Sequence, residues 1–426
     1  MANYVLVLNC GSSSAKFNLF KVVDELDLQP QLQGIVEEIG NPVRSGIKVV
    51  IAGSKEVIRR PIANHRDALT AIFDLLNDHE IARASICAVG HRIVHGGELY
   101  KGSVLIDQHV ITTIEQLIPI APLHNPPNLT GIRESIRLLP DVPQVAVFDT
   151  AFHTTLPEYA YRYAVPAKWY EAYGVRRYGF HGTSHMYIAR RAAHLLGIPF
   201  NRFSGITAHL GNGSSITKIE NGQSVDTSMG FTPLEGVIMG TRSGDIDPAL
   251  IRHVATNLAT DHDLDLGQAF ESVMTALNKE SGLKALADTN LMQDIRTKAE
   301  QGDLQAFTVI QIYAYRIAKY IGQYWATLPE AEAIVFSGGL GENEGYVRAA
   351  ILSFLPALGF TIDQEKNALR QQEVEIASSE IRKDSRLRVM VIPTDEEIVI
   401  GYDTLFLGHL KRPLPNRYPF ELDPIG

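Results

Sequence analysis

Several features that would classify this chain at once are scarce or missing among its 426 residues. It has only two cysteines, Cys10 and Cys87, which excludes a disulfide framework and favours a reducing, cytoplasmic location. No apolar run reaches the roughly 18 residues of a membrane span. The start, MANYVLVLNC, lacks the basic and apolar pattern of a signal peptide. We therefore expect a soluble protein that does not contact a membrane.

Basic residues are also in deficit. The chain has 39 Lys and Arg against 48 Asp and Glu, which gives a net charge of −9. A nucleic-acid-binding protein needs a surplus of positive charge to neutralise phosphates, so we expect no nucleic acid as a partner. Any anionic ligand must instead be attracted by a local cluster of Arg and Lys side chains.

The composition that is present indicates large hydrophobic cores, since 45% of the residues are hydrophobic and 20% are charged. The length suggests two or three domains, with an internal boundary at 150–165. Apolar strand-like runs alternate with helical patterns, which predicts an α/β fold. The predicted strands are 4–9, 16–22, 47–51, 86–90, 144–148, 204–210, 214–219, 333–336 and 388–392. The predicted helices are 65–77, 128–139, 184–196, 247–257, 302–326 and 395–407, and the Pro-rich segment 122–128 is predicted to be a functional loop.

A short internal repeat relates two of these strand pairs. In CGSSSAKFNLF (10–20) and NGSSITKIENG (212–222), Gly11 corresponds to Gly213 and Lys16 to Lys218. Both segments follow one apolar run and lead into another. The repeat fits either chance similarity or a duplication that gives two related domains, each with a Ser-rich β-turn-β element.

Glycine-rich turns are the first candidates for a binding site. In VLVLNCGSSSAK (5–16) a buried strand runs into small, hydroxyl-bearing residues, whose backbone N–H groups can approach a phosphate closely. An ordinary hairpin also favours Gly and Ser. A third glycine loop, 335–348, joins a strand to a helix and suits a nucleotide. No Walker A sequence is present.

Charged residues beside glycines are the second candidates. Arg92, His181 and Arg242 lie in glycine-rich segments, as expected of loops that line a pocket. The pairs His91/His95 and His181/His185 have a four-residue spacing, but neither has the His-Glu-x-x-His pattern, so we do not expect structural zinc.

Three further polar residues stand at the ends of predicted strands or just beyond them. Asp149 ends an apolar strand, as functional groups often do, but could equally cap a turn. Glu396 could be functional or could simply favour the dipole of a helix capped by Thr394 or Asp395. Asn9 could be functional or a turn former.

Taken in order, these segments resemble the acetate kinase family over nearly the whole chain. The motifs that carry the resemblance are LVLNCGSSSAKF, GHRIVHGG, APLHNPPN, VFDTAFH, RRYGFHGTSH, HLGNGSS, MGFTPLEGVIMGTRSGDIDP, SGGLGEN and IPTDEE. The resemblance implies two duplicated domains of the acetate and sugar kinase/Hsp70/actin (ribonuclease H-like) fold with an interdomain cleft. Residues 1–150 with 394–426 would form the acyl- and phosphate-binding domain, and 151–393 the nucleotide-binding domain. It also implies a homodimer.

The resemblance further implies the reversible reaction of ATP and acetate to ADP and acetyl phosphate, with Mg²⁺ or Mn²⁺. The implied catalytic residues are Asp149, His181, Arg242 and Arg92. The implied nucleotide and phosphate contacts are Lys16, Ser12, Ser14, His209, Leu210, Gly211, Asn212, Gly213, Gly339, Leu340, Gly341, Glu342 and Asn343. The implied substrate contacts are Arg92, Val94, Leu123, His124, Phe180 and Pro233, and the implied metal-associated residues are Asn9 and Glu396.

Elementary chemistry supports these roles. Phosphoryl transfer needs positioning and charge neutralisation, which the Arg, Lys and His side chains and a divalent cation supply. A small carboxylic acid has a pKa near ~4 and is already ionised at neutral pH, so it needs no base. We therefore expect Asp149 to orient an Arg side chain or a metal-bound water.

The chain departs from the family pattern in the segment after SGL (281–283). Where the family carries an Asp and an Arg that contact the nucleotide, this chain aligns with Leu291 and Gln293, although a shifted register would use Asp294 and Arg296. The choice of phosphoryl donor therefore stays open between ATP, another nucleotide and diphosphate. Asp395, where Asn is usual, and the extra residues after about 408 are lesser departures.

Two other functions are alternatives. A propionate or other short-chain acyl kinase is one, but Val94 should favour acetate because it is bulkier than Ala. A non-catalytic nucleotide-binding switch is the other, and the retained Arg92, Asp149, His181 and Arg242 argue against it.

Overall fold

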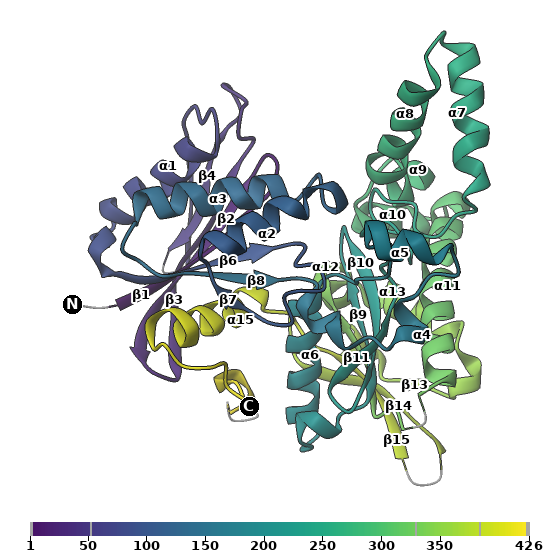
Figure 1. Cartoon of the computed structure of the whole chain (residues 1–426). Coiled ribbons are helices and arrows are strands. Elements are labelled where there is room, and N and C mark those ends of the chain that lie inside the picture. The colour runs from purple at the N-terminus through teal and green to yellow at the C-terminus, as the bar shows by residue number, and fades with distance from the viewer. Residues whose placement is uncertain (1–2, 52, 329, 383–384, 423–426) are drawn as a thin grey trace. The chain divides into compact units, whose positions relative to one another are not determined.

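The computed structural model describes residues 3–51, 53–328, 330–382 and 385–422, and the chain forms two compact units (Figure 1). Unit 1 comprises Met1–Thr154 and Asp395–Gly426, and unit 2 comprises Thr155–Thr394. Each unit contains one mixed β-sheet with helices packed against it, which confirms the predicted α/β class. Within the described ranges, no helix combines the length and the apolar character that crossing a bilayer requires.

Unit 1 is built on an eight-stranded sheet in the order β5-β4-β3-β2-β1-β6-β8-β7. Its strands are β1 (Asn3–Cys10), β2 (Ala15–Asp24), β3 (Asp27–Glu37), β4 (Gly46–Ile51), β5 (Ser54–Arg59), β6 (Ile86–Ile93), β7 (Val104–Leu105) and β8 (Gln144–Phe148). Its helices are α1 (His65–Asp78), α2 (Gln108–Gln116), α3 (Asn125–Leu138) and α15 (Glu396–Thr404), and a π-helical turn follows at Leu405–His409.

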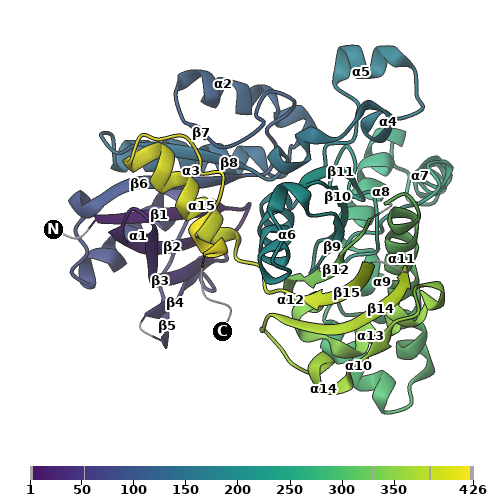
Figure 2. The same ribbon diagram turned by 90° about the horizontal axis from the view of Figure 1, so that it is seen from below.

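Both faces of this sheet are covered. On β1, Leu6 and Leu8 pack into the core that includes α1, and α15 lies against β1, β6 and β8 (Figure 2). The close approach of α15 depends on Gly90 of β6, because a Cβ atom there would clash with the Thr404 hydroxyl and the Ile400 side chain. This contact fixes the helix whose first residue is Glu396.

Unit 2 is built on a seven-stranded sheet in the order β11-β10-β9-β12-β15-β14-β13. Its strands are β9 (Gly205–Leu210), β10 (Ser214–Glu220), β11 (Gln223–Thr227), β12 (Ala333–Ser337), β13 (Thr361–Ile362), β14 (Val374–Arg382) and β15 (Ser385–Val391). Its helices are α4 (Glu158–Tyr161), α5 (Ala167–Tyr173), α6 (Gly182–Leu195), α7 (Ala249–Asp261), α8 (Leu266–Lys279), α9 (Gly282–Ala287), α10 (Met292–Glu300), α11 (Leu304–Ala326), α12 (Gly338–Asn343), α13 (Gly345–Ser353) and α14 (Gln364–Asn367).

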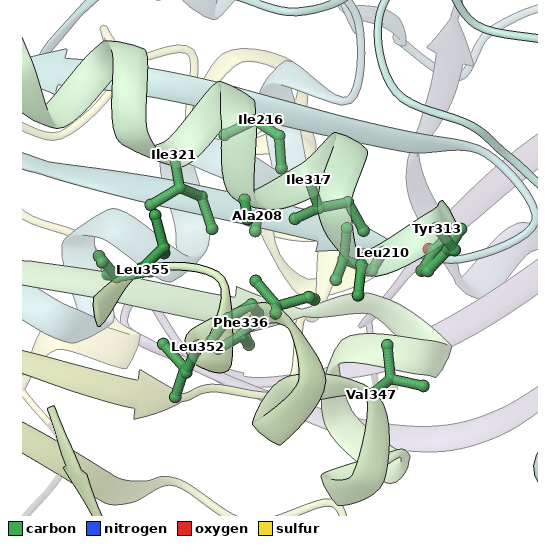
Figure 3. Packing of buried hydrophobic residues seen from close by; sticks show 14 of the residues in the cluster. Ala208, Leu210, Ile216, Tyr313, Ile317, Ile321, Phe336, Val347, Leu352 and Leu355 are labelled. Carbon is green, nitrogen blue, oxygen red and sulfur yellow. The ribbon is translucent and has the colours of Figure 1, made fainter. Parts of the chain in front are cut away.

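The core of unit 2 forms between its longest helix, α11, and the central strands. Tyr313, Ile317 and Ile321 repeat every four residues and therefore share one face of α11. Figure 3 shows this face directed toward side chains of the sheet, among them Leu210 and Phe336. All five side chains are fully buried, so this packing holds the ends of β9 and β12 in place.

Five strands of one sheet repeat the topology of five strands of the other. The orders β3-β2-β1-β6-β8 and β11-β10-β9-β12-β15 have antiparallel pairing in the first two contacts and parallel pairing in the last two. The predicted repeat is therefore present as the same hairpin in the same place of two related sheets.

The predicted register of the repeat is wrong. Lys16, the second residue of β2, pairs with Asn9, and the second residue of β10 is Ser215, which pairs with His209. Lys218 lies farther along β10, and its Nζ donates to the Thr327 carbonyl at 2.8 Å. The Gly-Ser match misled the alignment because the first turn spans 11–14 and the second only 211–213.

Other differences from the predicted elements have local causes. Strand β3 and helix α2 were not predicted, because β3 is polar and contains Pro30, and α2 is short. The segment 122–128, predicted as a loop, contains the first turn of α3, where Pro126 and Pro127 are tolerated because the first helical N–H groups need no intrahelical acceptor. Asp395 is the N-cap of α15 and accepts from Ile398 N at 2.9 Å.

Candidate active site

Three predicted residues meet at one edge of the sheet in unit 1. Arg92 is the penultimate residue of β6, and Asp149 directly follows β8. Because β6 and β8 are parallel, their carboxyl ends lie side by side. Arg92 Nε and Nη2 each donate to one oxygen of Asp149 at 2.8 Å. Glu396 Oε2 lies 3.5 Å from Arg92 Nη2, so this guanidinium faces two carboxylates.

Burial and charge pairing act together on this group. Burial lowers the pKa of Arg92, but the charges of Asp149 and Glu396 outweigh burial and raise it. Burial raises the pKa of Asp149, and the Arg92 charge opposes that rise. The neighbouring Glu397 also has a raised pKa, first through burial and then through Glu396. Arg92 therefore stays cationic and is locally neutralised.

A recess of about 50 Å³ in unit 1 adjoins this ion pair. Its lining includes two residues predicted to associate with a metal, Asn9 and Glu396, and also Lys16 and Arg92. Glu397 lines it too, and was missed although it follows Glu396 in the quoted motif. Over the described ranges, no three His, Cys, Asp or Glu side chains are grouped as a metal site. Two oxygen ligands with substrate phosphates would still suit Mg²⁺.

One positioning residue in unit 1 was also missed. Asn128 of α3 is buried, its Nδ2 donates to the Cys10 carbonyl at 2.8 Å, and its Oδ1 accepts from Val94 N at 3.1 Å. This amide thereby joins the end of β1, which carries Asn9, to the residue that follows β6. The asparagines of the 122–128 segment were its only sequence signal.

The first predicted histidine pair contributes to the packing of the same region. His91 is buried, and its Nε2 is 2.8 Å from Gln144 Oε1. His95 Nδ1 accepts from Gly97 N at 3.0 Å. Burial lowers the pKa of His91 to about 4 and of His95 to about 3, so both rings are neutral at pH 7.

In unit 2, two predicted residues converge on a glycine of the second hairpin. A Cβ atom placed on Gly213 would lie 3.2 Å from His181 Nε2 and 3.4 Å from Arg242 Nη1. Only a glycine leaves this space open beside both side chains. His181 precedes α6 with φ of 56°, a left-handed conformation that costs a non-glycine residue about 1 kcal/mol. Its ring stacks on His209 at 4.4 Å between centroids.

Arg242 differs from Arg92 in its partners. Its Nη1 lies 3.3 Å from the Pro233 carbonyl, and no carboxylate pairs with it in the part of the chain that the structure describes. Burial therefore lowers the pKa of Arg242 without an opposing charge. A half-buried cation without a counter-ion is a binding site for an anion.

The loop that carries Arg242 is held by its neighbours in unit 2. Gly240 N donates to the Asn212 carbonyl at 3.0 Å, which ties this loop to the hairpin turn. Leu283 N donates to the Met239 carbonyl at 2.9 Å. Gly282 has φ of 65°, and any Cβ atom there would clash with the Met239 carbonyl, so this close approach requires glycine.

The remaining predicted phosphate contacts lie in two turns. In unit 1, Ser12 is exposed and Ser14 half-buried, and Gly11 N donates to the Ser14 carbonyl at 2.8 Å. In unit 2, Gly338 packs against the backbone of Leu210, and Gly338 N donates to Glu342 Oε1 at 2.9 Å. The same carboxylate oxygen accepts from Thr394 N at 3.1 Å. Glu342 therefore stabilises this loop through backbone N–H groups.

The predicted substrate contacts are divided between the units. Val94, Leu123 and His124 belong to unit 1, where Val94 is half-buried and Leu123 is exposed. Phe180, which is buried, and Pro233 belong to unit 2.

The segment that departs from the family pattern lies at α10. Leu291 is exposed at its N-cap, whereas Arg296 Nε pairs with Glu344 Oε2 at 2.9 Å. Arg296 also lines a cavity of about 310 Å³ with Asn343, at the end of the third glycine loop. Of the two registers considered from the sequence, the one that uses Arg296 therefore brings a cation to the predicted nucleotide loop.

Comparison with known proteins gives matches along the whole chain. The family model described as the acetokinase family matches residues 4–402. The chain is 46% identical to the acetate kinase of Carboxydothermus hydrogenoformans over 95% of this chain and 98% of that protein. It is also 46% identical to the acetate kinase of Methanosarcina acetivorans over 94% of this chain and 96% of that protein.

Two solved structures extend these matches to the fold. The crystal structure of Porphyromonas gingivalis acetate kinase has a TM-score of 0.84 and 40% identity, covering 95% of this chain and 99% of that one. A propionate kinase from Francisella tularensis has a TM-score of 0.84 and 38% identity, covering 94% and 99%.

Proposed function

The chain belongs to the acetokinase family, and on this premise we propose that it transfers the γ-phosphoryl group of ATP to acetate, reversibly, to give acetyl phosphate and ADP. An acetate oxygen forms a bond to the γ-phosphorus while the bond from that phosphorus to the bridging β-phosphate oxygen breaks. The acid is ionised at neutral pH, so no proton has to be removed. The observation that carries the proposal is Arg242, a cation held beside His181 without a carboxylate partner.

Arg92 would bind the carboxylate of the acid through one edge of its guanidinium. The Nε/Nη2 edge is occupied by Asp149, so the Nη1/Nη2 edge is the one that can receive a substrate. This division supports a positioning role for Asp149, because a carboxylate that accepts two hydrogen bonds from Arg92 is poorly placed to act as a base. The resulting ion pair fixes the plane of the guanidinium.

Asn9 and Glu396 would hold the divalent cation that accompanies the nucleotide. An amide oxygen and a carboxylate fit Mg²⁺, which binds few protein ligands together with phosphate oxygens. The cation would neutralise charge on the phosphates. Lys16 lines the same recess and would contact the transferring phosphoryl group.

His181 and Arg242 would stabilise the charge that develops on the transferring group, with the turns 211–213 and 339–343 as nucleotide contacts. Small residues and donors preorganised around a vacant volume, as at Gly213, support this role. The position of Arg296 beside Asn343 supports a nucleoside triphosphate donor despite Leu291 and Gln293.

The test is trapping of acetyl phosphate by hydroxylamine as the coloured hydroxamate, with ATP, GTP and diphosphate supplied separately as donors. We expect acetate-dependent product with ATP and less with the other two. Absence of product with every donor would contradict the proposal. Arg242→Gln, assayed in parallel, reports background from any contaminating kinase.

A second candidate is propionate as acceptor, which the similarity to a propionate kinase structure favours. Val94 is the residue that would restrict the longer acid, and one methylene is worth about 1–3 kcal/mol, so both acids should react. Comparison of kcat/KM for acetate and propionate decides between the two preferences.

We further propose that the chain forms a homodimer and functions in the cytoplasm. The exposed apolar side chains on α7 and α8, Leu250, Leu266 and Phe270, support association, and light scattering at micromolar concentration tests it. Both cysteines are free, as suits a reducing compartment.

A further inference from the structure

A chain of hydrogen bonds in unit 2 leads from a buried threonine to His181. Thr207 Oγ1 is 2.7 Å from His185 Nδ1, His185 Nε2 is 2.7 Å from Ser215 Oγ, and Ser215 Oγ is 2.9 Å from His181 Nδ1. Thr207, His185 and Ser215 are fully buried. The three residues lie on β9, α6 and β10, so the sheet and the helix that covers it hold them together.

The single proton of Ser215 constrains both imidazoles. A hydroxyl group has one donor hydrogen, and Ser215 Oγ contacts a nitrogen of each histidine. Ser215 can therefore donate to only one of them, and the other nitrogen must carry the hydrogen that Ser215 accepts.

Thr207 decides which histidine donates. Among the residues that the structure describes, its hydroxyl has one hydrogen-bond partner, His185 Nδ1. A buried donor left unsatisfied is costlier than a spare lone pair on oxygen, so Thr207 donates its proton to His185 Nδ1. His185 then carries its own proton on Nε2 and donates to Ser215 Oγ, and Ser215 donates to His181 Nδ1.

The direction of this chain fixes the protonation of His181. Because Nδ1 accepts from Ser215, the imidazole is neutral and its proton is on Nε2. That nitrogen is the one beside Gly213, where Arg242 Nη1 also converges. A neutral N–H donor and a cationic guanidinium thus flank one position.

We propose that Thr207, His185 and Ser215 are positioning residues that hold His181 as its Nε2–H tautomer, so that it donates a hydrogen bond to the transferring phosphoryl group. The proposal rests on the phosphotransferase function above only for what His181 donates to. The tautomer itself is a property of the free protein. The two proposals can therefore fail separately.

The direct test is a long-range ¹H–¹⁵N correlation spectrum of full-length protein labelled at histidine, without substrates. The His181 signals are assigned by their loss in His181→Gln. We expect a protonated Nε2 and an unprotonated Nδ1 at pH 7. A protonated Nδ1, with or without a proton on Nε2, would overturn the proposal whether or not the protein makes acetyl phosphate.

Kinetics of three variants test the consequence. Ser215→Ala should lower kcat about 10- to 100-fold, less than the loss of a direct donor, and change KM for acetate and ATP by less than about threefold. Ser215→Thr keeps the hydroxyl and should recover most of the loss. Thr207→Val has nearly the same shape and should lower kcat about 3- to 10-fold, with both His181 tautomers in the spectrum.

A matched control lies directly across the strand pair from Thr207. Thr217 is also fully buried, but its hydroxyl bonds to Thr227 at 2.9 Å. Thr217→Val should leave both kcat and the His181 spectrum unchanged. Equal effects of Thr207→Val and Thr217→Val, or wild-type kcat in Ser215→Ala, would show that the hydrogen-bond chain does not position His181.

Discussion

Arg92 and Arg242 occupy related sheets under opposite electrostatic conditions. Arg92 faces two carboxylates, whereas Arg242 has none in the described part of the chain. The guanidinium of Arg92 is therefore held in a fixed plane by its own unit, and that of Arg242 lacks a counter-charge. The comparison teaches that one fold supplies two kinds of anion contact, a rigid one for orientation and an uncompensated one for charge.

The repeated strands explain how this difference arises. Asp149 follows β8 in unit 1, and the chain after the equivalent strand β15 reaches Thr394, which hydrogen-bonds to Ser184 at 2.8 Å. Where unit 1 has a carboxylate beyond its fifth shared strand, unit 2 has a hydroxyl. A charged edge suits a small anion with a metal ion, and a hydroxyl- and glycine-rich edge suits a polyphosphate.

The largest expected effects come from removing each arginine in turn. Arg242→Gln and Arg92→Gln should both lower kcat/KM about 10³-fold, because each takes a cation from the reacting centre. Their effects on stability should differ. Arg92→Gln leaves two carboxylates unpaired and should lower the free energy of unfolding by about 3 kcal/mol, whereas Arg242→Gln should leave it unchanged or raise it. Urea titrations of both variants measure this, and equal losses of stability would end the comparison.

The next effect concerns how Asp149 acts. Asp149→Asn should lower kcat about 10²-fold, because Arg92 loses the partner that orients it. If Asp149 acts through Arg92, the double variant with Arg92→Gln should be no slower than Arg92→Gln alone. Steady-state assays of the three variants test this. Additive losses would instead indicate an independent role, and normal turnover of Asp149→Asn would remove it from the site.

A smaller effect should follow from the apolar residue next to this charged edge. Val94→Ala should raise kcat/KM for propionate relative to acetate by about tenfold, since it opens space for one methylene. The matched control is Val57→Ala, an exposed valine of β5 in the same unit. An unchanged ratio of the two kcat/KM values would exclude Val94 from the acyl contact.

The smallest effect sharpens the role of β6, which carries both His91 and Arg92. Burial lowers the pKa of His91 to about 4 from its usual 6.5, so the unfolded chain binds a proton that the folded chain does not. The stabilisation is complete above pH 6.5 and is lost as pH falls toward 4. His91→Gln should reduce the slope of unfolding free energy against pH by up to about 1.4 kcal/mol per unit in this window. Urea titrations at pH 5 and 7 measure the slope, and the exposed His253→Gln should not change it.

Parts of the site could be predicted from local pattern. Glycines beside Arg92, His181 and Arg242 marked pocket-lining segments, and the apolar runs marked the strands at whose ends these residues lie. Residues without a local signature were missed. Asn128 and Ser215 look like ordinary helix and strand residues in the sequence, and their partners are distant along the chain.

By itself, the sequence determined that this protein has two α/β halves, glycine-rich turns after buried strands, and the motifs of one kinase family. Tertiary structure alone decided that Asp149 pairs with Arg92, that Arg242 pairs with no carboxylate in the described residues, and that Ser215 rather than Lys218 is the counterpart of Lys16. The physical reason is range. Periodicity reports the neighbours of a residue within one helix or strand, whereas charge pairing and hydrogen-bond direction depend on which strand ends become adjacent in space.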